Sequence, residues 1–286
     1  MKRFRSPLAW AVVGTVLALV AVTWWMLADP ATSRGDALKT GGLAGGAVAA
    51  MYGLWLNDRR RRTEEDRHEI ERARVADERF AKAVELLGNA ADPVRVGAMH
   101  TLQALARARP EYTQNVLDVL CGYLRLRFDH PDFDAVRPRD FEWTPETAAL
   151  ADREQQVRRT AQAVIRSLLP HPKQPDAPEY ALDLTGARLE RFNMARKKIK
   201  WLTLTRCQII GGAGFQDAVI PYMFFLNEAE TWGEVTFADA KFGSRAGFTD
   251  FTAHDPVDFT GAEFTVEPEL DNAVFPEGST LPARTG

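Results

Sequence analysis

Residues 182–191 read LDLTGARLER, and residues 257–266 read VDFTGAEFTV. In both stretches a leucine or phenylalanine returns after five residues, and another apolar residue stands two places before it. An α-helix repeats its face every 3.6 residues and a strand every two, so neither element produces a five-residue period. The stretch therefore indicates a structural repeat rather than ordinary helices or sheets.

The five-residue rhythm extends from Leu182 to about Phe275. We expect its large apolar side chains to form the interior column of the repeat, where burying each one contributes about 1.5–3 kcal/mol. Lys197 stands where a small residue belongs, and the eleven-residue spacings Phe248–Phe259 and Phe264–Phe275 predict irregular coils or loops. The column comprises Leu184, Leu189, Met194, Ile199, Leu204, Ile209, Phe215, Ile220, Phe225, Trp232, Phe237, Phe242, Phe259 and Phe264.

These copies resemble the pentapeptide-repeat family, whose consensus is a small residue, Asp or Asn, Leu or Phe, and two variable positions. The clearest copies begin at Leu182, Ala187, Ala240, Val257 and Ala262. The resemblance implies a right-handed quadrilateral β-helix with about twenty residues per coil, so that residues 182–276 hold between four and five coils. We expect the preceding helical residues to cap the first coil, because repeat arrays need covered ends.

Two apolar runs predict a transmembrane hairpin over residues 1–56. Leu8–Ala28 carries no charge in twenty-one residues and is long enough to span a hydrocarbon core of roughly 30 Å. Gly41–Leu56 is shorter and reaches that length only if residues 37–40 join it. The alternatives are a cleaved signal peptide for the first run and a buried soluble helix for the second. Basic residues before the first run and after the second predict that both termini face the cytoplasm.

Small residues recur every four positions in the second run, at Gly41, Gly45, Ala49 and Gly53. Such residues let two helices approach closely. Packing of the two predicted spans within one chain is the simpler interpretation, and homodimerisation through the second span is the alternative. With this anchor, the layout is similar to membrane-anchored pentapeptide-repeat proteins of actinobacteria, and it predicts a multi-pass protein of the cell membrane.

Helical patterns fill the middle of the chain. Residues 57–90 lack glycine and proline before Gly88 and contain oppositely charged pairs such as Glu78 and Lys82, which predicts a charged helix. Residues 91–170 predict a helical domain, either HEAT-like or a small bundle. Its helices begin at Asp92-Pro93, at Pro110 and at Pro145, and the last ends at Pro170.

Proline and polar residues mark the remaining boundaries. Residues 171–181 are rich in proline and predict a linker between the helical domain and the repeats. Residues 277–286, after the last repeat, predict a flexible tail. A polar loop, residues 128–144, separates the second and third helices of the helical domain.

Composition and motifs argue against an enzyme. The sequence contains no G-x-S-x-G, no phosphate-binding glycine loop and no H-E-x-x-H. Cys121 and Cys207 cannot form a disulfide framework. Asp129, His130, Asp132 and Asp134 fit a solvated loop better than a metal site. We therefore expect no catalytic residues, no cofactor and no metal.

Charge is segregated along the repeats. Residues 184–207 hold seven basic residues and one acidic residue, whereas residues 217–277 hold thirteen acidic residues and two basic ones. The need for solubility alone accounts for charged outward faces. A surface with one positively charged and one negatively charged region also suits protein docking. The candidate interaction residues are Arg188, Arg191, Lys197, Lys198, Lys200, Asp239, Asp250, Asp258 and Glu263.

These observations predict a non-enzymatic scaffold that is anchored in the lipid bilayer and presents a charged β-helix to a cytoplasmic protein. The formal net charge of −3 does not favour nucleic acid as the partner. The alternative, implied by the resemblance, is a mimic of DNA that binds a type II topoisomerase. The acidic part of the repeats fits that alternative, but the basic part does not.

Overall fold

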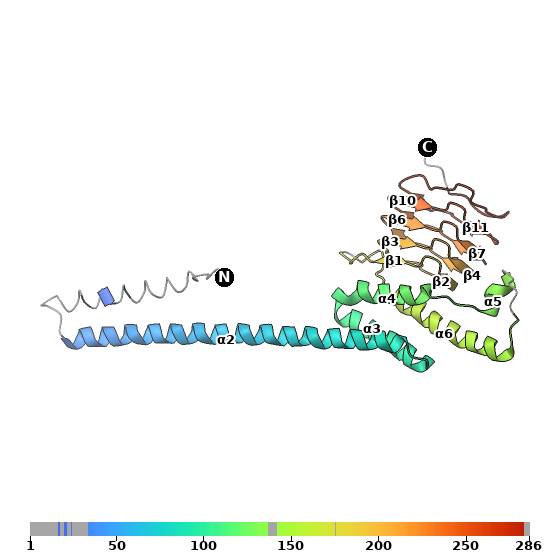
Figure 1. Ribbon diagram of the computed structural model, residues 1–286. Coiled ribbons are helices and arrows are strands. Elements are labelled where there is room, and N and C mark those ends of the chain that lie inside the picture. Colours follow the sequence, from blue (N-terminus) through green and yellow to red (C-terminus); the bar gives the residue numbers. More distant parts are fainter. Residues whose placement is uncertain are drawn as a thin grey trace. The chain divides into compact units, whose positions relative to one another are not determined.

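The computed structural model describes residues 17, 20, 21, 24, 34–136, 142–174 and 176–282 of the chain. The chain divides into two compact units, the first ending at Val75 and the second beginning at Ala76. In the second unit helices come first and a β-solenoid follows them (Figure 1). The helices of the described residues are α2 (Arg34–Leu87), which begins in the first unit, α3 (Asp92–Ala108), the 3-10 turn η1 (Pro110–Tyr112), α4 (Thr113–Arg125), α5 (Pro131–Val136) and α6 (Pro145–Leu168).

The predicted transmembrane hairpin is wrong for the part of the chain that the structure describes. No helix in that part is both long enough and apolar enough to cross a bilayer. The second apolar run, Gly41–Leu56, is one stretch of the 54-residue helix α2. Five of its sixteen residues are glycines, which have no side-chain area to bury, and charged residues follow it in the same helix. The first run, Leu8–Ala28, lies outside the described residues except for residues 17, 20, 21 and 24.

The helices of the second unit begin where proline predicts them. α3 begins at Asp92, η1 and α4 follow directly from Pro110, and α6 begins at Pro145 and ends two residues before Pro170. A capping box between Thr144 and Thr147 satisfies backbone N–H groups at the start of α6. The polar loop predicted over residues 128–144 instead contains the short helix α5.

Parallel strands build the solenoid, which has about four turns between residues 181 and 264, so the predicted β-solenoid is confirmed. Each strand pairs with its counterpart on the next coil, as Leu202 does with Leu182 on one side and Phe224 on the other. The strands are β1 (Ala181–Asp183), β2 (Arg188–Asn193), β3 (Trp201–Thr203), β4 (Gln208–Gly214), β5 (Val219–Ile220), β6 (Met223–Phe225), β7 (Glu230–Trp232), β8 (Val235–Thr236), β9 (Lys241–Phe242), β10 (Arg245–Gly247), β11 (Thr252–Ala253), β12 (Val257–Asp258) and β13 (Glu263–Phe264).

Most coils are longer than the predicted twenty residues. Ala181 pairs with Trp201, twenty residues further on, but Trp201 pairs with Met223 and Met223 pairs with Arg245, each time at twenty-two residues. Sides of five and six residues therefore alternate. The eleven-residue spacing from Phe248 to Phe259 is half of such a coil, so the irregular loops predicted from it are wrong.

A pair of glycines accommodates the first of the six-residue sides. The pairing of β2 with β4 shifts by one residue at Gly211 and Gly212, which stand opposite Arg191. Gly212 has φ +85°, and a Cβ there would lie 2.4 Å from the carbonyl oxygen of Glu234 on the next coil. No L-amino acid side chain fits that contact, so this corner requires glycine.

Aromatic rings stack through the interior of the solenoid. Phe237 is fully buried, and its ring lies nearly parallel to those of Phe215 and Phe259, with centroids 4.9 and 4.8 Å away. That separation matches the spacing of hydrogen-bonded strands, so each coil adds one layer to the column. The predicted core residues Leu184, Leu189, Ile199, Leu204, Ile209, Phe237, Phe242, Phe259 and Phe264 are all buried.

Two residues of the predicted column lie on the outside. Phe225 is partly exposed while its neighbour Phe224 is fully buried, and Trp232 is partly exposed while Thr231 is fully buried. Successive residues of a strand face opposite sides, so a slip of one residue exchanges inside for outside. The six-residue sides cause this slip. The Trp232 ring stacks instead on His254, with centroids 4.9 Å apart.

The helical layer covers the first coil, as expected (Figure 1). The free edge of β1 would otherwise expose unpaired backbone groups. The side-chain amide of Gln114 on α4 fills the place of a neighbouring strand: Ala181 donates its N–H to Gln114 Oε1 at 2.9 Å, and Gln114 Nε2 donates to the Ala181 carbonyl at 3.0 Å. Buried side chains form one core from Ala83 to Phe264, so the helices and the solenoid are packed together.

Candidate docking surface

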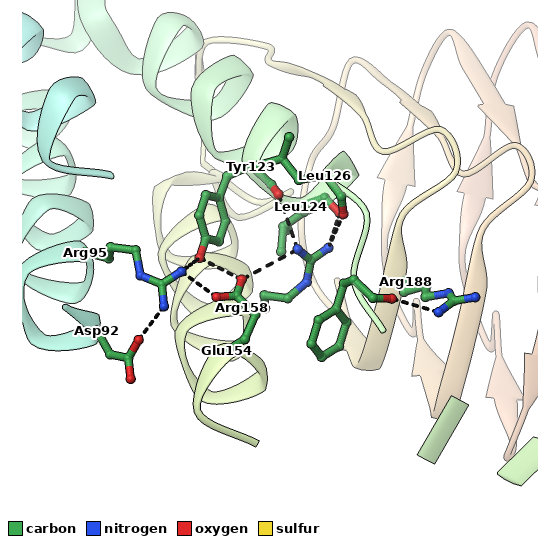
Figure 2. Close-up of polar contacts among 9 residues, drawn as sticks. Asp92, Arg95, Tyr123, Leu124, Leu126, Glu154, Arg158 and Arg188 are labelled. Carbon is green, nitrogen blue, oxygen red and sulfur yellow. Dashed lines mark hydrogen bonds and ion pairs between the residues drawn. The ribbon is translucent and has the colours of Figure 1, made fainter. Parts of the chain in front are cut away.

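A network of polar contacts joins the three helices beneath the solenoid (Figure 2). The guanidinium of Arg95 on α3 donates to the carboxylates of Asp92 and Glu154 and, at 2.8 Å, to the hydroxyl of Tyr123. The Tyr123 hydroxyl donates in turn to Glu154 at 2.8 Å. Burial and the Glu154 carboxylate raise the pKa of Tyr123, so the phenol keeps its proton and remains a donor.

Arg158 on α6 holds the end of α4. Its side chain is 3% exposed, and it donates to the carbonyl oxygens of Tyr123, Leu124 and Leu126 (Figure 2). These carbonyls lie at the end of a helix, where no further turn supplies N–H donors. The guanidinium also lies 4.7 Å from the centroid of the Phe128 ring. Burial lowers the pKa of Arg158, because a position away from water disfavours the charged guanidinium.

Two of the predicted surface cations are engaged within the chain. Arg188 donates to the Phe128 carbonyl at 2.8 Å and to Asp129 at 2.9 Å, which fixes β2 against the segment after α4 (Figure 2). Lys198 forms an ion pair with Glu179 at 3.0 Å. Both cations therefore attach the first coil to the residues before it.

Lys197 and Lys200 are also partly engaged. The Lys197 ammonium donates to the Leu169 carbonyl at 2.9 Å, and burial together with the charge of Arg166 lowers the pKa of this lysine. This contact explains how a lysine occupies a position that faces inward elsewhere in the solenoid. The Lys200 ammonium lies 5.7 Å from the ring centroid of Tyr222 and remains exposed.

Arg191 differs from these residues because its side chain is exposed and lines a groove. The opposite wall of the groove comes from α6, through Arg159, Gln162 and Arg166. None of these helix residues is among the interaction residues predicted from the sequence. Their spacing of three and four residues, opposite an apolar face, was the available signal that they share one side of α6.

Two predicted acidic residues are held in local contacts. Asp258 accepts hydrogen bonds from the Thr260 N–H at 2.9 Å and the Thr280 hydroxyl at 3.0 Å, and hydrogen bonds from Thr260 lower the pKa of Asp258. Thr280 thus keeps part of the predicted tail on the solenoid; residues 283–286 lie outside the described residues. Glu263 forms an ion pair with Lys241 at 2.8 Å on the neighbouring coil.

Asp239 and Asp250 lie at exposed corners, in two vertical rows. Backbone hydrogen bonds stack the same corner on successive coils, as from Asp217 N–H to the Ala238 carbonyl and from Glu228 N–H to the Thr249 carbonyl. We call these rows the corner ladders. The first consists of Arg196, Asp217 and Asp239, and the second of Arg206, Glu228 and Asp250.

Each ladder residue has a left-handed backbone, with φ between +54° and +58°. Glycine adopts this conformation most easily and occupies the same corner at Gly186 and Gly261. Charged residues therefore stand where glycine would be less strained. Within each ladder the first residue is arginine and the two that follow are acids. At the same corners Gly186 precedes Arg206, and Gly261 and Asn272 follow the two aspartates.

The loop around His130 is more ordered than the predicted solvated loop. His130 is 2% exposed, its Nε2 lies 3.0 Å from Asp152, and its Nδ1 accepts the Asp132 N–H at 3.1 Å. Across the described ranges, no three His, Cys, Asp or Glu side chains are grouped as a metal site would require. Cys121 and Cys207 are buried free thiols, and burial raises the pKa of each to about 12.

The geometry therefore separates the predicted surface into residues that attach the coils to their surroundings and residues at the exposed corners, of which Asp250 accepts a hydrogen bond from Asn272 Nδ2 at 3.0 Å. Comparison of the chain with protein-family models, with curated proteins and with solved structures finds no match in any of the three.

Proposed function

We propose that this chain is a non-enzymatic interaction scaffold of the pentapeptide-repeat type, and that the two corner ladders dock another protein. The observation that carries the proposal is the charge of the corners. Positions that suit glycine hold Arg196, Asp217 and Asp239 in one ladder and the equivalent charged residues in the other. Strained residues kept at an exposed position favour a functional role for their side chains.

The packing beneath the ladders supports this role. A single core runs from the helical layer to the upper coils, so the corners are mounted on a stiff support. A docking surface on such a support loses little conformational entropy when a partner binds. Charges of two signs at fixed spacing also favour one orientation of the partner over others.

Charge reversal in a ladder tests the proposal. A photo-crosslinking phenylalanine analogue replaces Tyr222, an exposed aromatic residue, in the full chain expressed in its native cells. We expect one discrete crosslinked product, and we expect the double variant Asp217→Lys with Asp239→Lys to reduce it at least fivefold. Lysine is compatible with this corner, because Arg196 occupies the same conformation one coil earlier.

The matched control makes the same change of charge elsewhere. Glu69→Lys with Glu71→Lys alters two exposed acids of α2 and is expected to leave the crosslinked product unchanged. Equal yields from the two double variants, or no discrete product from the native sequence, would show that the ladders do not dock a protein.

The DNA-mimic alternative makes a different prediction. It requires inhibition of a type II topoisomerase by the full chain at micromolar concentration. Arg196 and Arg206 at the first positions of both ladders do not fit a surface that copies a phosphate backbone.

A further inference from the structure

The groove between α6 and the first coil is lined by three arginines and one glutamate and so carries a net positive charge. Arg159 is neutralised by Glu190, whose two carboxylate oxygens each lie 2.6 Å from its guanidinium. Arg166 and Arg191 have no carboxylate partner within the part of the chain that the structure describes. The ammonium of Lys197, held on the Leu169 carbonyl nearby, adds to the local positive potential.

Two buried polar atoms of the groove residues have no partner. These are the acceptor Gln162 Oε1 and the donor Arg166 Nε. Buried polar groups in folded proteins are nearly always hydrogen-bonded, so each unpaired atom calls for an explanation. A ligand that satisfies both must offer a hydrogen-bond donor to Gln162 and an acceptor to Arg166.

We infer that this groove binds an acidic peptide segment of the docked protein, with a carboxylate on Arg166 and Arg191 and a backbone N–H on Gln162. A peptide carries both groups, whereas a fully ionised inorganic anion offers acceptors only. The groove is open to solvent, as an extended segment requires. This inference rests on the proposed scaffold function and adds the chemistry of the partner segment that the groove would receive.

Peptide titration of the purified full chain tests the inference. The probe is a fluorescein-labelled hexapeptide of alternating glutamate and alanine, and the comparison peptide has lysine in place of glutamate. We expect saturable one-to-one binding of the acidic peptide, at least tenfold tighter than that of the basic peptide. The affinity should weaken as salt rises from 50 to 300 mM, because salt screens exposed charges.

Arg191→Gly and Arg107→Ala each remove the charge of one exposed arginine. Arg191 has φ +46°, a conformation that glycine tolerates best, and alanine is the best helix former at Arg107 on α3, so neither change should disturb folding. Arg191 lines the groove, whereas Arg107 does not. We expect Arg191→Gly to weaken the acidic peptide at least fivefold and Arg107→Ala to weaken it less than twofold.

Three results would overturn the inference: equal binding of acidic and basic peptides, unchanged affinity in Arg191→Gly, or full displacement of the peptide by an equimolar amount of inorganic phosphate. Displacement by phosphate would mean that the groove binds a simple anion.

The crosslinking experiment distinguishes failure of the groove inference from failure of the scaffold proposal. If Arg191→Gly keeps the crosslinked product while the peptide does not bind, the groove inference falls and the scaffold proposal stands.

Discussion

Replacing Phe237 with aspartate is expected to leave the solenoid unfolded at 25 °C. The ring is fully buried between Phe215 and Phe259 and also contacts Phe224 and Phe248, so the change removes the centre of the aromatic column. Removal of a buried phenylalanine side chain costs about 3–5 kcal/mol, and an unpaired carboxylate in an apolar interior costs several more. Together these approach the roughly 5–15 kcal/mol that stabilises a typical domain.

Circular dichroism and thermal unfolding of the full chain measure this effect. Thr265→Asp introduces the same charge at an exposed position of the solenoid and should change the free energy of unfolding by less than about 0.5 kcal/mol. If Phe237→Asp melted at the native temperature, the interior column described above would be incorrect.

Arg158→Met is expected to lower the free energy of unfolding by about 3–5 kcal/mol, the usual effect of removing one partner from a buried charged contact. Methionine keeps much of the buried aliphatic volume but donates no hydrogen bond. The carbonyl oxygens of Tyr123, Leu124 and Leu126 then lose their side-chain donor, and the contact with the Phe128 ring is lost. Urea unfolding followed by circular dichroism gives the difference directly.

Arg153→Met is the matched control, since Arg153 lies on the same helix and is exposed. We expect a change within about 0.5 kcal/mol. Equal effects of the two substitutions would mean that Arg158 contributes no more than a surface arginine does, and that the end of α4 is held by other contacts.

The parts of the fold that depend on local signals are readily predicted from the sequence. Proline at Pro93, Pro110 and Pro145 marks helix starts because its missing N–H is unneeded in the first turn. The buried column is visible because one large side chain recurs on each side of a coil. The second apolar run was wrongly predicted to span a membrane. Its length approaches that of a membrane span, but its glycines contribute little hydrophobic area.

The parts that depend on contacts between coils are not visible in the same way. The added residue at Gly212 fits only because Glu234, twenty-two positions further on, approaches it closely. Likewise the groove exists because Arg159 meets Glu190, thirty-one positions away. Residue spacing does not reveal which distant residues come into contact. For this reason neither the register of the coils after residue 211 nor the α6 wall of the groove could be predicted from the sequence.

The assignment of ladders and groove depends on which residues of each coil face outward, and adjacent phenylalanines test this most directly. We expect Phe224→Ala to lower the free energy of unfolding of the full chain by about 3–5 kcal/mol, because Phe224 is fully buried among Phe215, Phe237 and Phe242. Phe225→Ala should lower it by less than about 1 kcal/mol, because Phe225 is partly exposed. The reverse order would place Phe225 inside, shift the outward residues by one and contradict the docking surface.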